Sequence, residues 1–497
     1  MLYNSTLNKE KKITAAEAIA AGIAPDGGLF VPCKFPAVSE AELKNMLSMK
    51  YTERAELIFS KYLTDFSADE ITECVEKAYT KEKFGAENPT PISCCAYNGN
   101  DLNILELWHG PTAAFKDMAL QILPHFLTKS IKKTGLNNKV VILVATSGDT
   151  GKAALEGFKN VDGTGIIVFY PENGVSPMQK RQMCTQEGNN VCVCAIKGNF
   201  DDAQTGVKAI FTDERINNVL RAENKQLSSA NSINLGRLLP QVVYYFSAYL
   251  DLVNKDKIYM GEKVNITVPT GNFGNILASY YAFRMGLPVN KFICASNSND
   301  VLTEFINTGV YNKNRTFYTT YSPSMDILVS SNLERLLYHI TNENSEMIKE
   351  LMLKLKTCGK YEVDSDIKEK ISEMFYGACC SDKETQETIG RLYSQSGYLC
   401  DTHTAVAINV YDKYVNETSD KTPCIIASTA SPYKFCKAVL GAVGDNLPAN
   451  EFEMADALNR LTGVNIPKPI AELKDKKARF KDTIEISGMP GYVTKNA

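Results

Sequence analysis

A lysine in an unusual turn is the most reactive group in the sequence. Lys116 ends the segment His109-Gly-Pro-Thr-Ala-Ala-Phe-Lys116 and opens a predicted helix over 116–134. The positive end of a helix dipole disfavours a cation in the first turn, and burial beside Phe115 would lower the lysine pKa further. Such a lysine favours the neutral amine that forms an imine with a carbonyl group. The alternative is a solvated surface lysine, which the small flanking residues make less ordinary.

A second turn offers a receptor for an anion. Ala145-Thr-Ser-Gly-Asp-Thr-Gly151 follows the predicted strand Val140–Ala145 directly. Its hydroxyls and its N–H groups at the start of the next helix suit a carboxylate or a phosphate. It does not fit a nucleotide-binding P-loop, because the glycine spacing is too short and Ala153 follows Lys152 where Ser or Thr is needed. A tight connection without a ligand remains the alternative.

A third turn is rich in glycine. Pro269-Thr-Gly-Asn-Phe-Gly-Asn275 lies between a predicted strand, Val264–Val268, and a predicted helix, Ile276–Phe283. Two glycines allow positive φ, and successive N–H groups at a helix N-terminus can converge on a phosphate. One such loop is weak evidence for a ligand-binding site, but its combination with the other two turns is strong evidence.

The elements around these turns predict an α/β protein. Short apolar runs alternate with amphipathic segments from Asn103 onward. Strands that read as continuous apolar runs between helices indicate parallel sheets covered on both faces, here two doubly wound units. In that class ligands lie outside the carboxyl ends of the strands, where these turns are expected to meet. The predicted strands are Val140–Ala145, Gly165–Tyr170, Val191–Ile196, Val264–Val268, Phe292–Ala295 and Cys424–Ala427.

The chain is expected to divide into four parts. Residues 1–95 form a mostly helical subdomain, 96–260 and 261–449 form the two α/β domains, and 450–497 form a C-terminal surface wrap. A helical insertion is expected at about 330–415. Helical spacing in the first part predicts Thr14–Ala21, Ser39–Leu47, Thr52–Tyr62 and Ser67–Ala78, the last three capped by their own first residues.

Composition excludes several classes of function. A net charge of −3 without long charged runs gives no case for a nucleic-acid or membrane partner. No signal peptide or apolar stretch of membrane-spanning length is visible, so we expect a cytoplasmic protein. The 14 cysteines include no C-x-x-C pattern, and the 4 histidines include no i, i+4 pair, so we expect reduced thiols and no metal site.

The three turns, in this order, resemble threonine synthase. The resemblance covers nearly the whole chain and separates it from the tryptophan synthase β and cysteine synthase relatives. It also includes the segments Tyr3–Thr6, Ala24–Pro32, Ser232-Ile-Asn-Leu-Gly-Arg237, Ser322-Pro-Ser-Met-Asp-Ile327, Ser330-Ser-Asn332 and Ser428-Thr-Ala-Ser-Pro-Tyr-Lys-Phe435. The insertion after residue 330 is typical of the long-chain branch found in yeast and enteric bacteria.

This resemblance implies a fold-type II enzyme that uses pyridoxal 5′-phosphate (PLP) in a cleft between two α/β domains. Lys116 matches the Schiff-base lysine, with Phe115 beside it. Thr429 is expected to face the pyridine nitrogen, with Ser428 as the alternative. The loop that holds the cofactor phosphate matches Gly271, Asn272, Phe273, Gly274 and Asn275, and the turn that meets the cofactor 3′-oxygen or the substrate carboxylate matches Ser147, Asp149 and Thr150.

The implied activity is that of a carbon–oxygen lyase, which converts O-phosphohomoserine and water to threonine and phosphate. Arg237, after Asn234, is the preferred receptor for the leaving phosphate, because an arginine fork fits phosphate oxygens. Lys180 and Arg181 come second, and ordinary surface charges are the alternative for all three. Ser431 stands where the family usually has His, so we expect no essential proton transfer at that position.

Other interpretations stay open at this point. A different enzyme on the same scaffold, such as threonine dehydratase or cysteine synthase, is the nearest rival. A non-catalytic ligand-sensing relative is a second, and a nucleotide-dependent enzyme is a third. The oligomeric state, monomer or homodimer, is not decided by the sequence.

Overall fold

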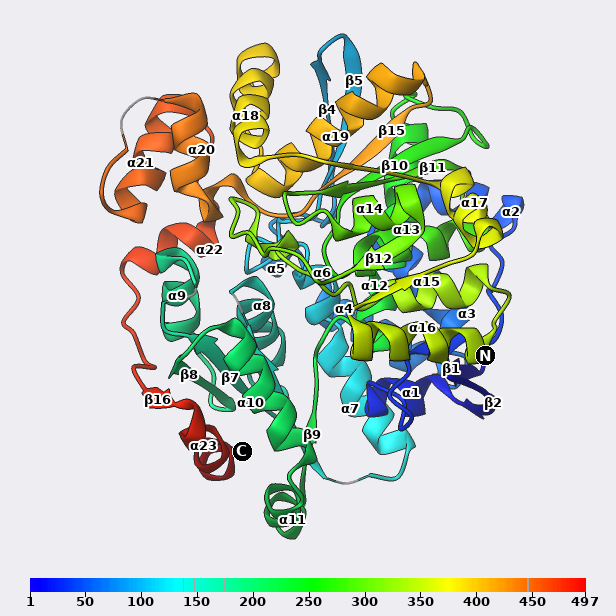
Figure 1. The fold of residues 1–497 in the computed structure, drawn as a ribbon. Helices are drawn as coiled ribbons and strands as arrows, with labels where there is room; N and C mark the ends of the chain where they lie inside the picture. The colour runs from blue at the N-terminus through cyan, green and yellow to red at the C-terminus, as the bar shows by residue number, and fades with distance from the viewer. Residues whose placement is uncertain (137, 147, 174, 445–446) are drawn as a thin grey trace.

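Two open sheets organise the chain, each with helices on both faces (Figure 1). This computed structural model describes residues 1–136, 138–146, 148–173, 175–444 and 447–497. The predicted α/β architecture is confirmed, and all six strands predicted from apolar runs are present within a few residues of their expected ends.

The larger sheet has six strands in the order β14-β11-β10-β15-β5-β4. All neighbouring pairs are parallel except β4 and β5, which form an antiparallel hairpin at one edge. Its strands are β14 (Phe375–Cys379), β11 (Val289–Ser296), β10 (Val264–Pro269), β15 (Cys424–Ser428), β5 (Asn100–Glu106) and β4 (Ile92–Tyr97).

The smaller sheet has five parallel strands in the order β16-β8-β7-β6-β9. Its strands are β16 (Thr483–Glu485), β8 (Val191–Lys197), β7 (Thr164–Pro171), β6 (Lys139–Ala145) and β9 (Lys225–Ser228). In β6 the residues alternate between two cores: Val140 and Ile142 belong to the main core and Val141 and Leu143 to a separate one. Burial on both faces therefore explains why this strand reads as a continuous apolar run.

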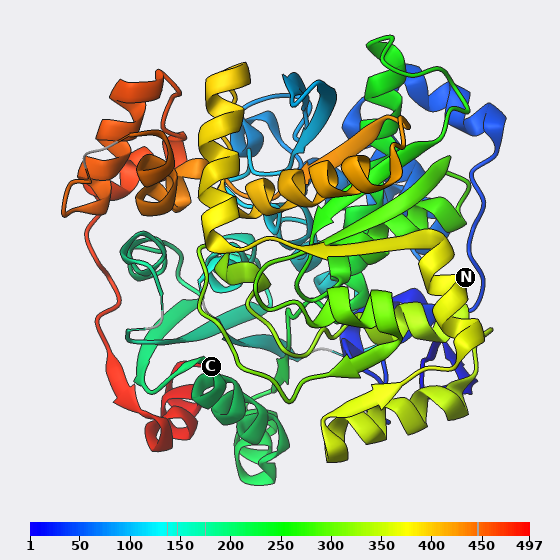
Figure 2. The same ribbon diagram turned by 45° about the horizontal axis from the view of Figure 1, so that its top comes forward.

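Helices cover both sheets (Figure 2). Those of the larger sheet include α13 (Gly274–Arg284), α14 (Val301–Thr308) and α19 (Thr402–Thr418). Those of the smaller sheet include α8 (Asp149–Phe158), α9 (Pro177–Cys184), α10 (Phe200–Thr212) and α11 (Glu214–Ala222). The buried helix α12 (Leu235–Asn254) packs on α13 and on α3 of the N-terminal part.

The N-terminal part combines helices with a three-stranded sheet of order β2-β1-β3. Ser39 and Ser67 cap their helices as predicted, each in a capping box. The predicted cap at Thr52 is wrong: α3 starts at Tyr51, and Lys50 occupies the capping position. The elements are β1 (Tyr3–Ser5), β2 (Asn8–Ile13), α1 (Ala15–Ala21), β3 (Phe30–Pro32), α2 (Glu40–Asn45), α3 (Tyr51–Tyr62), α4 (Ala68–Ala78) and α5 (Lys81–Phe84).

The predicted insertion at about 330–415 is not wholly helical, because β14 within it forms an edge strand of the larger sheet. The sequence signal for this strand was weak, because β14 is short and contains Gly377, where a Cβ atom would lie 3.2 Å from Ile306 Cβ. The other elements of this region are β12 (Val310–Asn312), α15 (Leu333–Ile340), α16 (Ser345–Cys358), β13 (Lys360–Glu362), α17 (Ser365–Met374) and α18 (Asp382–Ser396).

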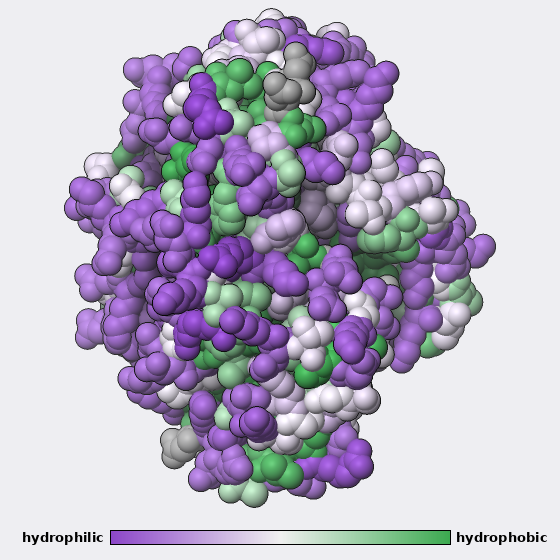
Figure 3. All heavy atoms as spheres, turned by 90° about the vertical axis from the view of Figure 1, so that its left-hand side faces the viewer, coloured by the Kyte–Doolittle hydropathy of each residue, from purple (hydrophilic) through white to green (hydrophobic). Residues whose placement is uncertain are grey.

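The C-terminal segment does more than wrap the surface. After α20 (Cys436–Val443), α21 (Glu451–Thr462) and α22 (Lys468–Ala471), the chain runs along one side of the molecule to β16 and α23 (Met489–Asn496), seen in red in Figure 1. There β16 extends the smaller sheet beside β8. Figure 3 shows this side, where hydrophilic residues predominate around smaller apolar patches.

The sheets also cut across the predicted domain boundaries. The hairpin β4–β5 belongs to the larger sheet with β10, β11 and β15, although the whole hairpin precedes residue 261. The boundaries themselves stay a prediction. No helix among the described residues combines the length and the apolar character needed to cross a membrane.

Candidate active site

The three turns identified in the sequence converge on one buried cluster. The turn after β5 carries Lys116, the turn after β6 carries Asp149, and the turn after β10 carries Gly271. Lys116 Nζ lies 3.9 Å from Asp149 Oδ2. A fourth segment joins them, because Ser324 Oγ lies 3.4 Å from both Lys116 Nζ and Asp149 Oδ2. The expected meeting at the carboxyl ends of the strands is therefore observed for these residues.

Burial dominates the chemistry of Lys116. It lowers the pKa of the amine to about 8, with Asp149 opposing this shift and Lys434 and Arg237 reinforcing it. The Phe115 ring lies beside the amine, with its centroid 4.9 Å from Nζ. With this pKa about a tenth of the amine is unprotonated at pH 7, far more than for an ordinary lysine, as a nucleophilic lysine requires.

The expected contribution of a helix dipole to this pKa is limited by the local structure. The predicted helix over 116–134 is divided into α6 (Asp117–Leu120) and α7 (Leu123–Lys133), with Pro124 in the first turn of α7. A four-residue helix has too few aligned peptides for a strong dipole. The lowered pKa of Lys116 comes chiefly from burial.

Asp149 is an ionised carboxylate in a buried position. Its Oδ1 lies 2.6 Å from Lys434 Nζ and accepts a hydrogen bond of 3.0 Å from Gln179 Nε2. Burial would raise the pKa of Asp149, but Lys434 and Lys116 outweigh it and hold the pKa well below its ordinary value. The site thus contains a fixed negative charge beside the reactive amine.

The turn around Asp149 depends on glycine. Gly148 has φ of 138°, and a Cβ atom there would lie 2.4 Å from the side chain of Gln179. Thr146 Oγ1 accepts hydrogen bonds from the N–H groups of Gly148 and Gly151, at 3.0 and 2.9 Å. Thr150 is half-buried on the first turn of α8, and Ser147 lies outside the described residues.

The glycine-rich loop is anchored by the segment after β12. Ser330 Oγ donates to Gly271 O at 2.7 Å, and Asn332 Nδ2 donates to Asn272 O at 3.0 Å. A Cβ atom on Gly271 would lie only 2.8 Å from Ser324 O, so this position requires glycine for close approach. The expected positive φ at the glycines is wrong: Phe273 carries it, at 61°. Position 271 therefore needs glycine for space and not for backbone conformation.

Asn275, in the first turn of α13, offers an unused donor. Its Oδ1 accepts hydrogen bonds from Tyr244, at 2.9 Å, and from Tyr245. Its Nδ2 is buried without a partner among the described residues. An orphaned buried donor beside a tightly packed loop is what a bound polar group would satisfy. Together with the buried amine of Lys116, this donor set fits PLP.

The two hydroxyls after β15 differ in their contacts. Ser428 Oγ accepts hydrogen bonds from Trp108 Nε1 and Thr404 Oγ1, both at 3.0 Å. Thr429 is held next to the lysine turn through its backbone, because Phe115 N donates to Thr429 O at 2.8 Å. The Ser428 hydroxyl is therefore already engaged by two protein donors, which favours Thr429 for a ligand contact. Ser431 is fully buried and caps the next turn through Tyr433 N.

The expected phosphate receptors are placed differently from one another. Arg237 is buried in the first turn of α12, where Nη1 donates to Ala230 O at 2.9 Å and Nε has no partner among the described residues. Burial lowers the pKa of Arg237 to about 10. Asn234, by contrast, uses its side chain to cap α12 and to contact Ile19 O at 3.1 Å. Its amide is thus already engaged.

The second-choice cations, Lys180 and Arg181, form no hydrogen bond or ion pair with this cluster in the part of the chain that the structure describes. Arg181 donates to backbone carbonyls of the C-terminal segment, including Leu473 O at 3.0 Å. Lys180 is exposed on the same helix. Lys180 is therefore an ordinary surface charge, whereas Arg181 holds the C-terminal segment against α9.

Sequence reasoning missed four residues around the reactive amine. Ser324 and Lys434 lay inside recognised segments, but nothing in their spacing marked them. Gln179 orients Asp149, and His403 Nε2 accepts a hydrogen bond of 3.2 Å from Ser324 N. His403 is oriented in turn by Asp401, 2.7 Å from its Nδ1. An Asp-x-His pattern at a helix start was the one available signal.

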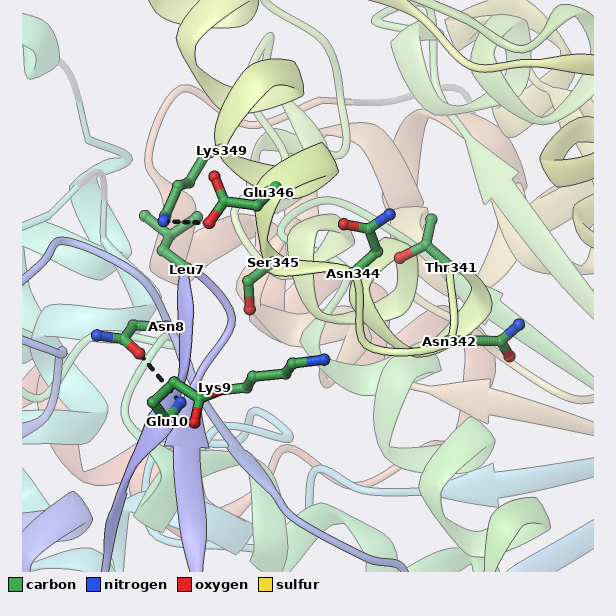
Figure 4. Close-up of a pocket in the computed structure, with 10 residues that line it drawn as sticks. All are labelled: Leu7, Asn8, Lys9, Glu10, Thr341, Asn342, Asn344, Ser345, Glu346 and Lys349. Atoms are coloured by element: carbon green, nitrogen blue, oxygen red, sulfur yellow. Dashed lines mark hydrogen bonds and ion pairs between the residues drawn. The ribbon is translucent and has the colours of Figure 1, made fainter.

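Cavity size does not locate this site. A cavity of about 460 Å³ lies between the β1–β2 hairpin and the start of α16, where polar side chains such as Asn8, Asn344 and Lys349 surround it (Figure 4). A second, apolar cavity of about 240 Å³ lies beside Ser330 and Tyr311. Neither is lined by Lys116, so we define the site by its chemistry.

The fold and the buried lysine cluster define a PLP-dependent enzyme of fold type II. A family model described as "Pyridoxal-phosphate dependent enzyme" matches residues 83–429. Two further models, "Threonine synthase N terminus" and "Threonine synthase, C-terminal", match residues 2–79 and 404–485. The chain belongs to the threonine synthase family.

Known proteins and structures match this chain over most of its length. Threonine synthase of Pseudomonas aeruginosa is 38% identical, over 93% of this chain and 94% of its own. The human protein named Threonine synthase-like 1 is 43% identical over 87% of this chain, which spans only 59% of the human protein. The crystal structure of threonine synthase from yeast superposes with a TM-score of 0.89 at 33% identity, covering 100% of this chain and 98% of that one.

Proposed function

We propose that this protein is a threonine synthase, which converts O-phosphohomoserine and water to L-threonine and phosphate. The observation that carries the proposal is a buried lysine with a pKa of about 8, held between a carboxylate and a hydroxyl at the point where three strand-to-helix turns meet. Family membership and the agreement with threonine synthases over most of the chain support it.

Each part of the cluster has a place in this proposal. PLP, when bound, supplies the electron sink for removing protons next to the amino group. Lys116 would carry it, and as a free amine would then move protons at Cα and Cβ of the substrate. Backbone N–H groups of Gly271–Asn275 would hold the cofactor phosphate, with Asn275 Nδ2 as an additional donor.

Ser324 and Asp149 would orient the lysine during these transfers. Both lie within 4 Å of Nζ, and the Ser324 backbone is fixed by His403. Asp149 stays ionised, so it favours a positive charge on Nζ whenever the amine has accepted a proton. Thr150 and Ser147 are proposed to meet the substrate carboxylate or the cofactor 3′-oxygen.

Arg237 is the proposed receptor for the substrate phosphate. It is buried, no carboxylate lies within 4.0 Å of it among the described residues, and it acts electrostatically on Lys116. A buried cation without an anion beside it is costly, and a dianionic group would compensate it. Asn234 would support this role by fixing the start of α12 rather than by touching the substrate.

Thr429 is proposed to face the pyridine nitrogen, since Ser428 is engaged by Trp108 and Thr404. A hydroxyl there, in place of a carboxylate, would leave that nitrogen largely unprotonated. Ser431, buried and engaged as a cap, has no proposed role in proton transfer.

The remaining assignments are coarser. The partner is proposed to be a small-molecule substrate, with no nucleic acid and no membrane, in a cytoplasmic monomer or homodimer. One relative of this chain is named Threonine synthase-like 1 and not threonine synthase. The assay must therefore separate synthase activity from the rival activities.

The discriminating experiment compares three amino acids. Purified protein loaded with PLP should release phosphate from O-phosphohomoserine and form threonine, while threonine and O-acetylserine are turned over slowly or not at all. Borohydride reduction and peptide mapping should find the pyridoxyl group on Lys116. Its recovery on another lysine would contradict the assignment of the site.

A further inference from the structure

Asp149 lies between two buried lysines, only one of which the proposed chemistry uses. Its Oδ2 lies 3.9 Å from Lys116 Nζ, and its Oδ1 lies 2.6 Å from Lys434 Nζ. The Lys434 side chain is 0% exposed, and Nζ also donates to Thr112 O at 3.1 Å. The result is a buried row of three titratable groups, Lys434, Asp149 and Lys116.

Stability alone is a poor reason for such an arrangement. The attraction within a buried ion pair must overcome the loss of hydration of both ions. Well-packed apolar residues in the same place often stabilise the fold equally well. The position of the pair is more informative. One oxygen of the carboxylate is taken by Lys434, and the other faces the reactive amine.

The charges around Lys116 act in opposite directions. Asp149 and Asp117 favour the ammonium form, whereas Lys434 and Arg237 add to burial in favouring the free amine. Without a cation opposite it, Asp149 would act on Lys116 with its full charge. Lys434 offsets this negative potential while it keeps the carboxylate ionised.

We propose that Lys434 offsets the negative charge of Asp149 at Lys116 and so keeps the Lys116 amine free and nucleophilic. The geometry that supports this is the shared carboxylate, with one lysine on each oxygen. The inference rests on the proposed attachment of PLP to Lys116, and it assigns a role to a lysine that touches neither reacting atoms nor solvent.

The chain contains a matched control. Lys152 is also buried and paired, 3.0 Å from Glu156 and hydrogen-bonded to Gln186, and within the described ranges no hydrogen bond or ion pair joins its side chain to Asp149 or Lys116. Substitution of Lys152 should disturb a buried ion pair on α8, the helix that also carries Asp149, without changing the electrostatic potential at the Lys116 amine. Lys152→Gln therefore separates general destabilisation from the proposed effect.

The experiment measures PLP uptake by full-length protein from which the cofactor has been removed, followed by absorbance between pH 6 and 10. Because the free amine reacts, the rate of uptake should rise with pH around a midpoint near 8. Lys434→Gln removes the charge but keeps a hydrogen-bond donor to Asp149. Its midpoint should rise by about one pH unit or more, since a nearby cation is lost.

Two further variants complete the comparison. Lys434→Arg keeps the charge and should keep the midpoint of the wild-type protein, and Lys152→Gln should lower thermal stability without moving the midpoint. An unchanged midpoint in folded Lys434→Gln would overturn the inference. If that variant does not fold, Asp149→Asn is compared with the double variant Asp149→Asn/Lys434→Gln, and equal midpoints would again overturn it.

The two proposals fail in different ways. Uptake that persists in Lys116→Ala would contradict the attachment of PLP to Lys116, and with it the proposed function. Uptake that requires Lys116 but ignores the charge at position 434 would contradict only the role of Lys434.

Discussion

Ser324 Oγ lies 3.4 Å from Lys116 Nζ, although 208 residues separate the two along the chain. The same hydroxyl lies 3.4 Å from Asp149 Oδ2. Ser324→Ala should remove both contacts and leave the backbone hydrogen bond to His403 intact. Because the lysine loses an orienting partner, we expect kcat to fall by roughly tenfold with near-normal PLP content. Wild-type kcat in this variant would remove Ser324 from the catalytic site.

Two glycines of the cofactor loop should respond differently to the same substitution. In Gly271→Ala the new Cβ atom would lie 2.8 Å from a backbone oxygen, whereas in Gly274→Ala its nearest neighbour is a side-chain nitrogen at 3.5 Å. Gly271→Ala should therefore weaken PLP binding strongly, and Gly274→Ala should bind nearly as wild type. Equilibrium titration of PLP measures both. Equal affinity in the two variants would contradict the close-approach argument.

Arg237→Lys tests the phosphate receptor. The variant keeps the charge but loses the bidentate fork, so kcat/KM for O-phosphohomoserine should fall about tenfold, a loss of about 1.4 kcal/mol in transition-state stabilisation. PLP content should stay normal. The control is Arg54→Lys, since Arg54 is a buried arginine paired with Asp251 at 2.7 Å in the N-terminal part.

The two arginine variants should give opposite patterns. Arg54→Lys should lower the midpoint of thermal unfolding and leave kcat/KM near normal in the folded enzyme. If Arg237→Lys behaves in the same way, Arg237 is a structural residue and the phosphate receptor must be sought elsewhere.

The burial of Lys116 predicts a pH-dependent stability in protein without PLP. The pKa of the amine is about 8 in the folded protein, against an ordinary value of 10.5, so the unfolded state binds more protons between these pH values. Stability relative to Lys116→Met should therefore rise from pH 8 to pH 10.5, by up to roughly 3 kcal/mol. Denaturant unfolding of both proteins measures this difference. A difference that stays constant with pH would contradict the lowered pKa.

Much of the fold could be predicted because burial leaves a local trace. The central strands of both sheets are continuous apolar runs, and Ser39 and Ser67 sit three residues before a glutamate in capping boxes. The break in the predicted helix over 116–134 had a local signal in Pro124, which was not used. By contrast, β14 and β16 are short edge strands whose pairing depends on distant partners.

The candidate site was predictable only in part, for the same reason. Lys116 and Asp149 lie in turns whose composition is unusual in itself. Ser324 reaches the amine, and Lys434 reaches Asp149, through contacts between segments hundreds of residues apart, which spacing along the chain cannot reveal. The role of glycine in the cofactor loop was also non-local, since the limiting atom is Ser324 O.

The most direct test of the account is the product balance with O-phosphohomoserine. Purified protein loaded with PLP is incubated with this substrate, and threonine and phosphate are measured together, with Lys116→Ala as the inactive reference. The account predicts that the two products appear in equal amounts in the wild-type protein and that neither appears in the variant. Phosphate release without threonine, or no release at all from PLP-loaded protein, would contradict it.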